Sequence, residues 1–282
     1  MLRVQPSKGW WFSVECRATL CPMPDDSILA HQEAAVLTLT LNRPAAFNSF
    51  TQPMAAALQT HLRAADEDAS VRCVVLTGAG KAFCAGQDLK EITGEDAPTF
   101  EEIVGGSYNA TVRLIRGLKK PVIAAVNGVA AGAGANLALA CDLCVAAEGA
   151  KFIQAFSKIG LIPDSGGTWM LPRLVGMQRA TALAYLGTPV AAAEAAAMGM
   201  IHQAIPAEQF LSDVAALAAH LSAMPTKGLA LTKQAFNKAF EQGLSAQLDT
   251  ELELQGAASR TRDYQEGVAS FLEKRKPTFE GH

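Results

Sequence analysis

The sequence predicts an α/β fold with an appended helical region. Over the first two thirds of the chain, apolar runs of strand length alternate with longer segments of helical periodicity. Over the last third, almost every segment has helical periodicity alone. No internal repeat or low-complexity linker interrupts this order. A chain of 282 residues, 50% of them hydrophobic, is long enough to build one large domain with a substantial core.

The strands are expected where apolar and β-branched residues run together. Residues 27–41 read as two short strands separated at 31–33, and Asn42-Arg43-Pro44 ends the second of them. Strands buried on both faces are predicted by the uninterrupted apolar runs 71–77, 122–126 and 143–147.

The helices follow from capping residues and 3.6-residue periodicity. Thr51 is expected to cap a helix that ends near residue 68, because a Thr side chain accepts a hydrogen bond from a free backbone N–H of the first turn. From residue 169 on, nearly everything is expected to be helical except a segment within 200–205. Further helices are expected at 98–118, 132–140, 207–221, 226–241, 244–258 and 261–273.

Three regions follow from these patterns. Residues 1–22 lack the apolar core of a secretion signal and differ from the rest, so they are expected to be a non-native or disordered extension. Residues 23–220 are expected to form the α/β core. Residues 221–282 are expected to form a helical region for oligomerisation or for a lid, because its Ala- and Leu-rich helix faces need a partner surface.

Composition argues against several kinds of partner. A net charge of −3 and a pI near 6 give no basic surface for nucleic acid. Cys141 and Cys144 form a lone C-x-x-C pair in an apolar run, so we interpret them as buried small hydrophobes and expect no metal. The uncharged stretch 121–141 has the length of a membrane span, but Asn127-Gly128 reads as a turn that divides it. A cytoplasmic protein without nucleic-acid or membrane partners is expected.

Two glycine-bearing loops each follow a predicted buried strand. They are GAGKAFCAGQDL at 78–89 and NGVAAGAGAN at 127–136. Small residues let a ligand approach the backbone and leave amide N–H groups free, so two such loops side by side can direct two donors at one developing oxyanion. The residues alone leave open two other readings. One is a phosphate loop, although the G-x-G-x-x-G spacing fails at Leu137, and the other is tight helix–strand packing.

Several pieces of the chain, in order, resemble the crotonase (enoyl-CoA hydratase/isomerase) superfamily. The resemblance implies a crotonase-like spiral of β-β-α repeats, an acyl-CoA thioester substrate and homotrimers that usually pair into hexamers. It implies no separate cofactor, because coenzyme A is part of the substrate. The pieces are NRPAAFN at 42–48, VVLTGAGKAFCAGQDL at 74–89, KPVIAAVNGVAAGAG at 120–134, Cys141-Asp142, and GLIPDSGGT at 160–168.

The resemblance also implies a site. The backbone amides of Ala85 and Ala133 would form an oxyanion hole for the thioester carbonyl. The family often has a basic residue where Ala45 stands, so no phosphate contact is implied there. Substrate and CoA contacts would come from Ala45, Ala46, Phe47, Ala85, Gln87, Asp88, Leu89, Gly132, Asn136 and Phe156.

The reaction class follows from which carboxylates are present. Hydratases of this family use two glutamates, because two protons move and a water is held between them. Asn136 and Phe156 stand in those two positions, so hydration is not expected. A carboxylate appears instead at Asp164, and one carboxylate suits an isomerase, because it can take a proton from one carbon and return it to another. From the residues alone, Asp164 also reads as a turn or cap residue.

Three segments narrow the resemblance further. AGANLALACD around Asn136, FSKIGLIPDSGGTW, and the tail from Asp263 to Phe279 are similar to the ring-epoxide isomerases of bacterial phenylacetate breakdown. Those enzymes convert ring-1,2-epoxyphenylacetyl-CoA to oxepin-CoA and shift Δ3 double bonds to Δ2. The nearest alternative is a Δ3,Δ2-enoyl-CoA isomerase of fatty-acid oxidation. From a different class, the alternative is a catalytically silent crotonase that serves as an oligomeric scaffold.

Overall fold

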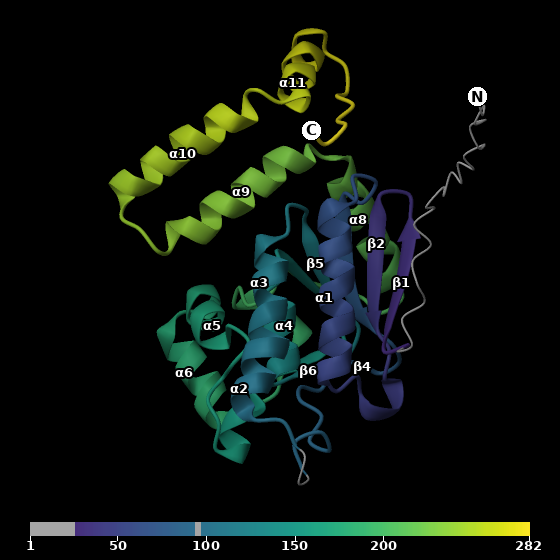
Figure 1. Cartoon of the computed structure of the whole chain (residues 1–282), viewed down its shortest axis with the longest axis vertical. Coiled ribbons are helices and arrows are strands. Elements are labelled where there is room, and N and C mark those ends of the chain that lie inside the picture. The colour runs from purple at the N-terminus through teal and green to yellow at the C-terminus, as the bar shows by residue number, and fades with distance from the viewer. Residues whose placement is uncertain (1–25, 94–96) are drawn as a thin grey trace, which may run out of the picture.

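The computed structural model describes residues 26–93 and 97–282, so the predicted extension 1–22 lies outside the described residues (Figure 1). The larger of two sheets has six strands in the order β1-β2-β3-β5-β7-β10. β1 pairs with β2 antiparallel, and all other pairs in this sheet are parallel. The strands are β1 (Ile28–Glu33), β2 (Val36–Leu41), β3 (Cys73–Gly78), β5 (Val122–Val126), β7 (Leu143–Ala147) and β10 (Gln203–Ile205).

A second sheet of four short strands has the order β4-β6-β8-β9. β3, β5 and β7 of the large sheet are each followed by a strand of this small sheet and then by helix, so the chain winds as a spiral of β-β-α turns. The spiral predicted from the resemblance is therefore confirmed. The short strands are β4 (Ala82–Cys84), β6 (Val129–Ala131), β8 (Lys151–Ile153) and β9 (Val190–Ala191).

The first hairpin differs from its prediction. β1 continues through 31–33, which the sequence pattern placed in the turn, and the chain reverses at residues 34 and 35. Ala34 adopts a left-handed conformation there (φ 48°), which a non-glycine residue rarely does outside a tight turn. The turn therefore lacks the glycine or asparagine from which the sequence would have predicted it.

Helices cover the large sheet and hold the spiral together. Thr51 accepts a hydrogen bond from the Met54 N–H and caps α1 (Gln52–Glu67), as predicted. Met54, Leu58 and Leu62 recur at helical spacing on its buried face. The spiral helices also include α2 (Phe100–Glu102), η2 (Ile103–Asn109), α3 (Ala110–Gly117), α4 (Ala133–Leu139), α5 (Gly167–Val175), α6 (Met177–Leu186) and α7 (Ala192–Ala197).

α8 (Phe210–Ala223) packs on the large sheet from a separate side. Phe210, Val214 and Ala218 form a second apolar cluster with strand residues such as Val75 and Ile123. These strand residues alternate along β3 and β5 with those of the main cluster, so the sheet is buried on both faces, as its continuous apolar runs predict.

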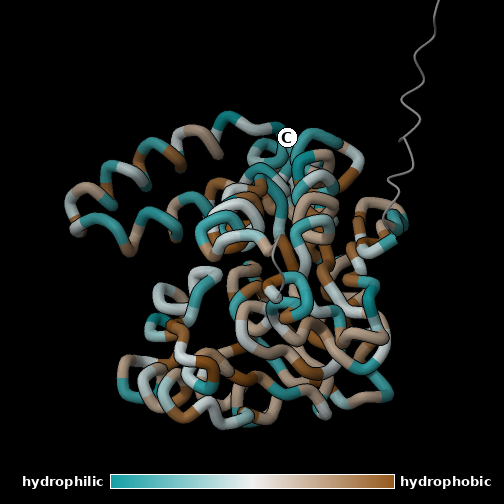
Figure 2. Tube along the Cα trace, turned by 60° about the horizontal axis from the view of Figure 1, so that its bottom comes forward, coloured by the Kyte–Doolittle hydropathy of each residue, from teal (hydrophilic) through white to brown (hydrophobic). Residues whose placement is uncertain are grey.

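The last three helices project from the spiral. α9 (Thr226–Ala239) and α10 (Leu244–Ala258) form an antiparallel arm, and α11 (Arg262–Leu272) closes the chain (Figure 1). Hydrophobic and hydrophilic residues alternate along the arm, whereas hydrophobic ones gather inside the spiral (Figure 2). The arm is anchored by Lys233, whose buried ammonium lies 2.8 Å from an Asp142 carboxylate oxygen and donates to the Ile115 carbonyl. Among the described residues, no helix is long and apolar enough to cross a membrane.

Candidate active site

A cavity of about 330 Å³ lies where the two glycine-bearing loops, the η2 helix and the segment 155–164 meet. Its walls are mainly apolar, and Asp164 is the one carboxylate among the lining residues that the structure describes. The structure brings seven of the predicted site residues to this cavity: Ala85, Gln87, Leu89, Gly132, Ala133, Phe156 and Asp164. It leaves five elsewhere: Ala45, Ala46, Phe47, Asp88 and Asn136.

In the first loop, the Ala85 backbone N–H already has a hydrogen-bond acceptor within the protein. Its N–H donates to the Phe47 carbonyl at 3.0 Å, so the prediction that it serves as an oxyanion donor is wrong. The donor available in this loop is Gln87. Gln87 forms an isolated parallel bridge with Phe50, in which the Phe50 N–H donates to the Gly86 carbonyl and the Asp88 N–H donates to the Phe50 carbonyl. The Gln87 N–H, in the same peptide unit as the Gly86 carbonyl, points away from Phe50 and has no acceptor among the described residues.

In the second loop, Ala133 offers the matching donor. It is the first residue of α4, so its N–H has no partner within the helix, and no other described group accepts from it. Gly132 before it has a φ of 54°, which a residue without a side chain adopts readily. Gly86 must also be glycine, because a Cβ there would lie 3.0 Å from the Ala131 carbonyl oxygen and 3.6 Å from the Ala133 nitrogen. The two loops therefore lie in contact, and both free donors line one cavity.

Asp164 is held by the turn that follows it. Its carbonyl accepts from the Gly167 N–H at 2.7 Å, and Ser165 and Gly166 both have positive φ. The Ser165 hydroxyl donates to one carboxylate oxygen of Asp164 at 2.9 Å. Burial raises the pKa of Asp164 above the ordinary value, and the Ser165 hydrogen bond offsets this in part. A half-buried carboxylate with a raised pKa in an apolar cavity has the properties of a proton-transfer group.

Apolar side chains form the part of the cavity around Asp164. Phe156, Ile159 and Leu161 line it, together with residues of the η2 helix. Ile162, two residues before Asp164, is 77% exposed and does not line it.

Asn136 lies behind the cavity and does not line it. Its side-chain N–H donates to the Asp164 carbonyl at 2.9 Å, and its side-chain oxygen accepts from Gln154 at 2.8 Å. Asn136 is fully buried in this arrangement. The predicted direct contact with substrate is therefore replaced by a contact with the backbone that carries Asp164.

Replacing Asn136 with Ala is expected to lower stability and to reduce turnover much less than loss of Asp164. The variant leaves the Gln154 amide buried without a partner, which costs about 1–3 kcal/mol of the free energy of unfolding. Chemical denaturation and steady-state kinetics measure the two effects separately. If turnover disappears while the fold and CoA binding survive, Asn136 takes part in the chemistry.

The first predicted contact segment also has another role in the structure. Asp88 forms an ion pair with Arg43 at 2.8 Å and accepts from the Ser49 hydroxyl, which fixes the loop before α1. Ala45 and Ala46 lie in a single 3-10 turn, and Phe47, 54% exposed, follows in a left-handed conformation. Contact of these three residues with CoA stays a prediction.

The η2 helix contributes residues to the cavity that the sequence pattern did not indicate. This segment is a π-helix, and it brings Ile103, Val104 and Tyr108 to the cavity. The sequence pattern predicts only a regular helix over 98–118. Gly105 and Gly106 within that helical pattern were the available signal of irregularity.

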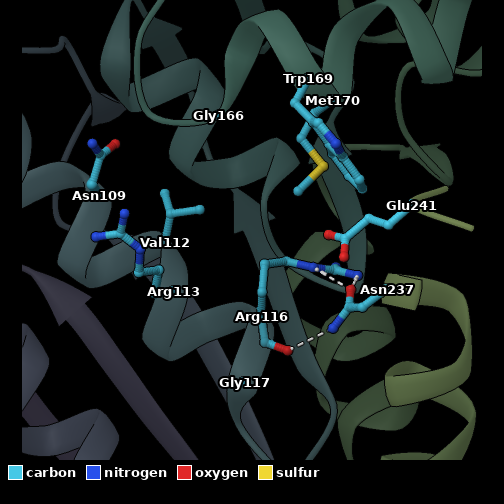
Figure 3. A pocket seen from close by; sticks show the side chains of 10 residues that line it. All are labelled: Asn109, Val112, Arg113, Arg116, Gly117, Gly166, Trp169, Met170, Asn237 and Glu241. Atoms are coloured by element: carbon cyan, nitrogen blue, oxygen red, sulfur yellow. Dashed lines mark hydrogen bonds between the residues drawn. The ribbon is translucent and has the colours of Figure 1, made fainter.

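A wider cleft of about 650 Å³ lies between α3, α5 and the end of α9 (Figure 3). None of the predicted site residues lines it. Arg116, which points into it in Figure 3, is held by Asn237 and by Asp142, so its charge is already paired. In the part of the chain that the structure describes, no group of three His, Cys, Asp or Glu side chains is placed to hold a metal ion. Cys141 and Cys144 are both buried, as the sequence predicts, and burial raises the pKa of Cys141 to about 12.

The spiral and the two adjoining loops with free backbone donors define one class of protein, and comparison with known proteins agrees. Residues 31–282 match the enoyl-CoA hydratase/isomerase family, and the chain belongs to that family. It is 51% identical over 257 residues to a 1,2-epoxyphenylacetyl-CoA isomerase of Escherichia coli (strain K12), covering 90% of this chain and 98% of that protein. It is 46% identical to a probable enoyl-CoA hydratase of Rhodobacter capsulatus, covering 86% of this chain and 93% of that protein.

Solved structures share the same fold. An enoyl-CoA hydratase from Bacillus anthracis superposes with a TM-score of 0.83 at 35% sequence identity, covering 91% of this chain and all of that one. The crotonase fold predicted from the sequence is thereby confirmed.

Proposed function

We propose that this protein isomerises an acyl-CoA thioester through an enolate-like state, with Asp164 as the group that moves the proton. The observation that carries the proposal comes from the described residues: one carboxylate lines the cavity, together with two backbone donors that have no acceptor among those residues. A thioester carbonyl oxygen placed between the Gln87 and Ala133 N–H groups gains negative charge when the α-proton leaves, and both donors stabilise that charge. Asp164 then returns the proton to another carbon.

Isomerisation is favoured over hydration because, among the described residues, no second carboxylate lines the cavity. Adding water needs one group to activate the water and another to deliver a proton. Asn136 is buried behind Asp164, and an amide takes up no proton at neutral pH in any case. Phe156 is apolar and packs into the cavity wall. An isomerisation leaves the composition of the substrate unchanged, so one carboxylate that accepts and returns a proton suffices.

The proposed substrate is ring-1,2-epoxyphenylacetyl-CoA, which the reaction converts to oxepin-CoA in phenylacetate breakdown. Support comes from the 51% identical relative of that name and from the mainly apolar cavity. The alternative is a Δ3,Δ2-enoyl-CoA isomerase, which the same carboxylate and donors would serve.

A panel of CoA thioesters tests both proposals. It contains enzymatically generated epoxyphenylacetyl-CoA, 3-enoyl-CoAs of several chain lengths and 2-enoyl-CoAs for hydration. We expect the largest kcat/KM for the ring epoxide and none for hydration. Faster hydration of a 2-enoyl-CoA than any isomerisation would refute the isomerase assignment. No turnover of any thioester would favour a silent scaffold.

We also propose that the protein assembles as a homotrimer or as a hexamer of two trimers. Leu244, Leu248 and Leu252 lie one turn apart along α10 and are exposed, so this apolar stripe lacks cover within the described chain. Multi-angle light scattering gives the mass directly. A monomer at micromolar concentration would contradict the proposal.

A further inference from the structure

A chain of hydrogen bonds runs from the η2 helix to the first donor loop. The Tyr108 hydroxyl lies 2.8 Å from the side-chain oxygen of Gln87, and the Gln87 amide nitrogen donates to a Glu91 carboxylate oxygen at 2.7 Å. The other carboxylate oxygen of Glu91 accepts from the Gln52 N–H, at the start of α1. A carboxylate only accepts, so the amide nitrogen of Gln87 must face Glu91 and its oxygen must face Tyr108. Tyr108 is therefore the donor, and both ends of the Gln87 side chain are held.

Tyr108 is itself fixed in place. It is 1% exposed, and its ring stacks on Phe50 with ring centres 5.4 Å apart. Phe50 is also the residue that pairs through its backbone with Gln87. Phe50, Gln87 and Tyr108 thus contact one another in pairs. Phe50 pairs with Gln87 through the backbone, Phe50 stacks on Tyr108 through the rings, and the Tyr108 hydroxyl donates to Gln87. A π-helical segment in place of a regular helix positions Tyr108, and such segments are frequent at functional sites.

We propose that Tyr108 is a positioning residue, whose hydroxyl holds Gln87 so that the Gln87 backbone N–H stays directed at the thioester carbonyl. This inference depends on the proposed function, because it assigns a task to the donor loop of the same site. The Gly86 carbonyl already anchors the peptide unit that carries this N–H, through the Phe50 N–H at 2.7 Å. Gly86, with a φ of 91° and no side chain, leaves the remaining rotation of that unit weakly constrained. The Gln87 side chain supplies the missing constraint.

The hydroxyl is suited to a permanent structural hydrogen bond. Burial, with nearby Cys84, Asp164 and Glu91, raises the pKa of Tyr108 well above the ordinary value of tyrosine. The hydroxyl therefore stays protonated, and remains a donor to Gln87, across the pH range in which the protein is folded.

The Tyr108→Phe variant tests the inference because it removes only the hydroxyl and keeps the ring that stacks on Phe50. We expect kcat to fall roughly tenfold, since a misdirected donor acts mainly on the charged state that follows proton loss. KM should stay within about twofold, because ground-state binding uses the whole CoA thioester. Tyr185→Phe is the matched control, because Tyr185 is 76% exposed on α6, and it should leave both constants unchanged.

A second variant separates positioning from packing. Gln87→Met keeps the length of the side chain and breaks the same hydrogen bond from its other end. The double variant should lose no more than the larger single loss, because both changes remove one interaction. The inference would be overturned if the loss of kcat in the double variant equalled the product of the two single losses. It would also be overturned if Tyr108→Phe kept the wild-type kcat. If Tyr108→Phe does not fold, Gln87→Met alone gives the same readouts.

A chromophoric thioester keeps this test independent of the natural reaction. The absorption of 4-dimethylaminocinnamoyl-CoA moves to longer wavelength when hydrogen bonds polarise its carbonyl. Bound to wild type it should show that shift, and bound to Tyr108→Phe it should show a smaller one. Equal shifts would overturn the inference. A shift that depends on Tyr108, in a wild-type protein that turns over no thioester, would instead uphold the positioning role and refute the proposed function.

Discussion

Replacing Asp164 with Asn is expected to abolish isomerisation while leaving acyl-CoA binding intact. Asparagine keeps the volume of the side chain and can still accept from the Ser165 hydroxyl, but it takes up no proton at neutral pH. General base catalysis contributes ~10²–10⁴-fold, and in the described part of the chain no second carboxylate lines the cavity to replace Asp164. Exchange of the substrate α-proton with deuterated solvent reports enolate formation even without net product. The wild type should exchange and the variant should not.

The matched control is Asp213→Asn, which makes the same chemical change at a partly exposed residue of α8 outside the cavity lining and should exchange at the wild-type rate. Equal exchange in wild type and Asp164→Asn would show that the base lies elsewhere. Asp164 would then be the turn residue that its position after Pro163 also allows.

Asp164→Asn is expected to lower activity but not to lower the stability of the fold at neutral pH, because the pKa of Asp164 is raised in the folded protein. Burial makes the folded protein bind the Asp164 proton more tightly than the unfolded chain does. Ionisation therefore costs no stability below the ordinary aspartate pKa, and the cost grows as pH rises from that value to the raised pKa, above which it stays constant. Asp164→Asn should be at least as stable as wild type at neutral pH and should lose that advantage in acid. Wild-type kcat/KM should rise with pH through the same raised pKa. Denaturation at acid and neutral pH, and a pH–rate profile, measure the two consequences.

The parts of the fold that the sequence predicted well are those with strong local signals. β3, β5 and β7 are continuous apolar runs, and Thr51 begins α1 with a capping side chain. The three-residue strands β4, β6 and β8 have no period long enough to detect, and two of them lie inside the glycine-bearing loops. Only the structure identifies them as strands, through their pairing with one another across long stretches of chain.

Within the site, the side chain of Asp164 was predicted and the backbone donor of the first loop was missed. The choice between Ala85 and Gln87 depends on how that loop pairs with Phe47–Phe50, almost 40 residues earlier. A strand exposes its N–H groups alternately to either side, so the register of that distant pairing decides which amides remain free. Asn136 was misplaced for a related reason. Its position on α4 is correct, but the backbone of 164–167 fills the space that a substrate contact would need.

Removing the N–H of Ala133 should produce the second-largest loss of activity. Ala133→Pro deletes one of the two proposed oxyanion donors, because proline has no backbone N–H. Proline is well tolerated as the first residue of a helix, and Ala133 holds that position in α4. One donor is worth about 3 kcal/mol of barrier, or ~10²-fold in kcat, and affinity for CoA thioesters should change far less. Stopped-flow or steady-state kinetics at saturating substrate measures the loss.

A matched proline separates this effect from damage to a helix. Met177 is the first residue of α6, follows a glycine of positive φ as Ala133 does, is 68% exposed and does not line the cavity. Met177→Pro should leave turnover unchanged. The pair also has a spectroscopic readout, since the carbonyl of bound 4-dimethylaminocinnamoyl-CoA should be less polarised in Ala133→Pro and unaffected in Met177→Pro. A folded Ala133→Pro variant that binds CoA thioesters and keeps the wild-type kcat would remove Ala133 from the oxyanion hole. The developing charge would then have to be met by the Gln87 N–H alone.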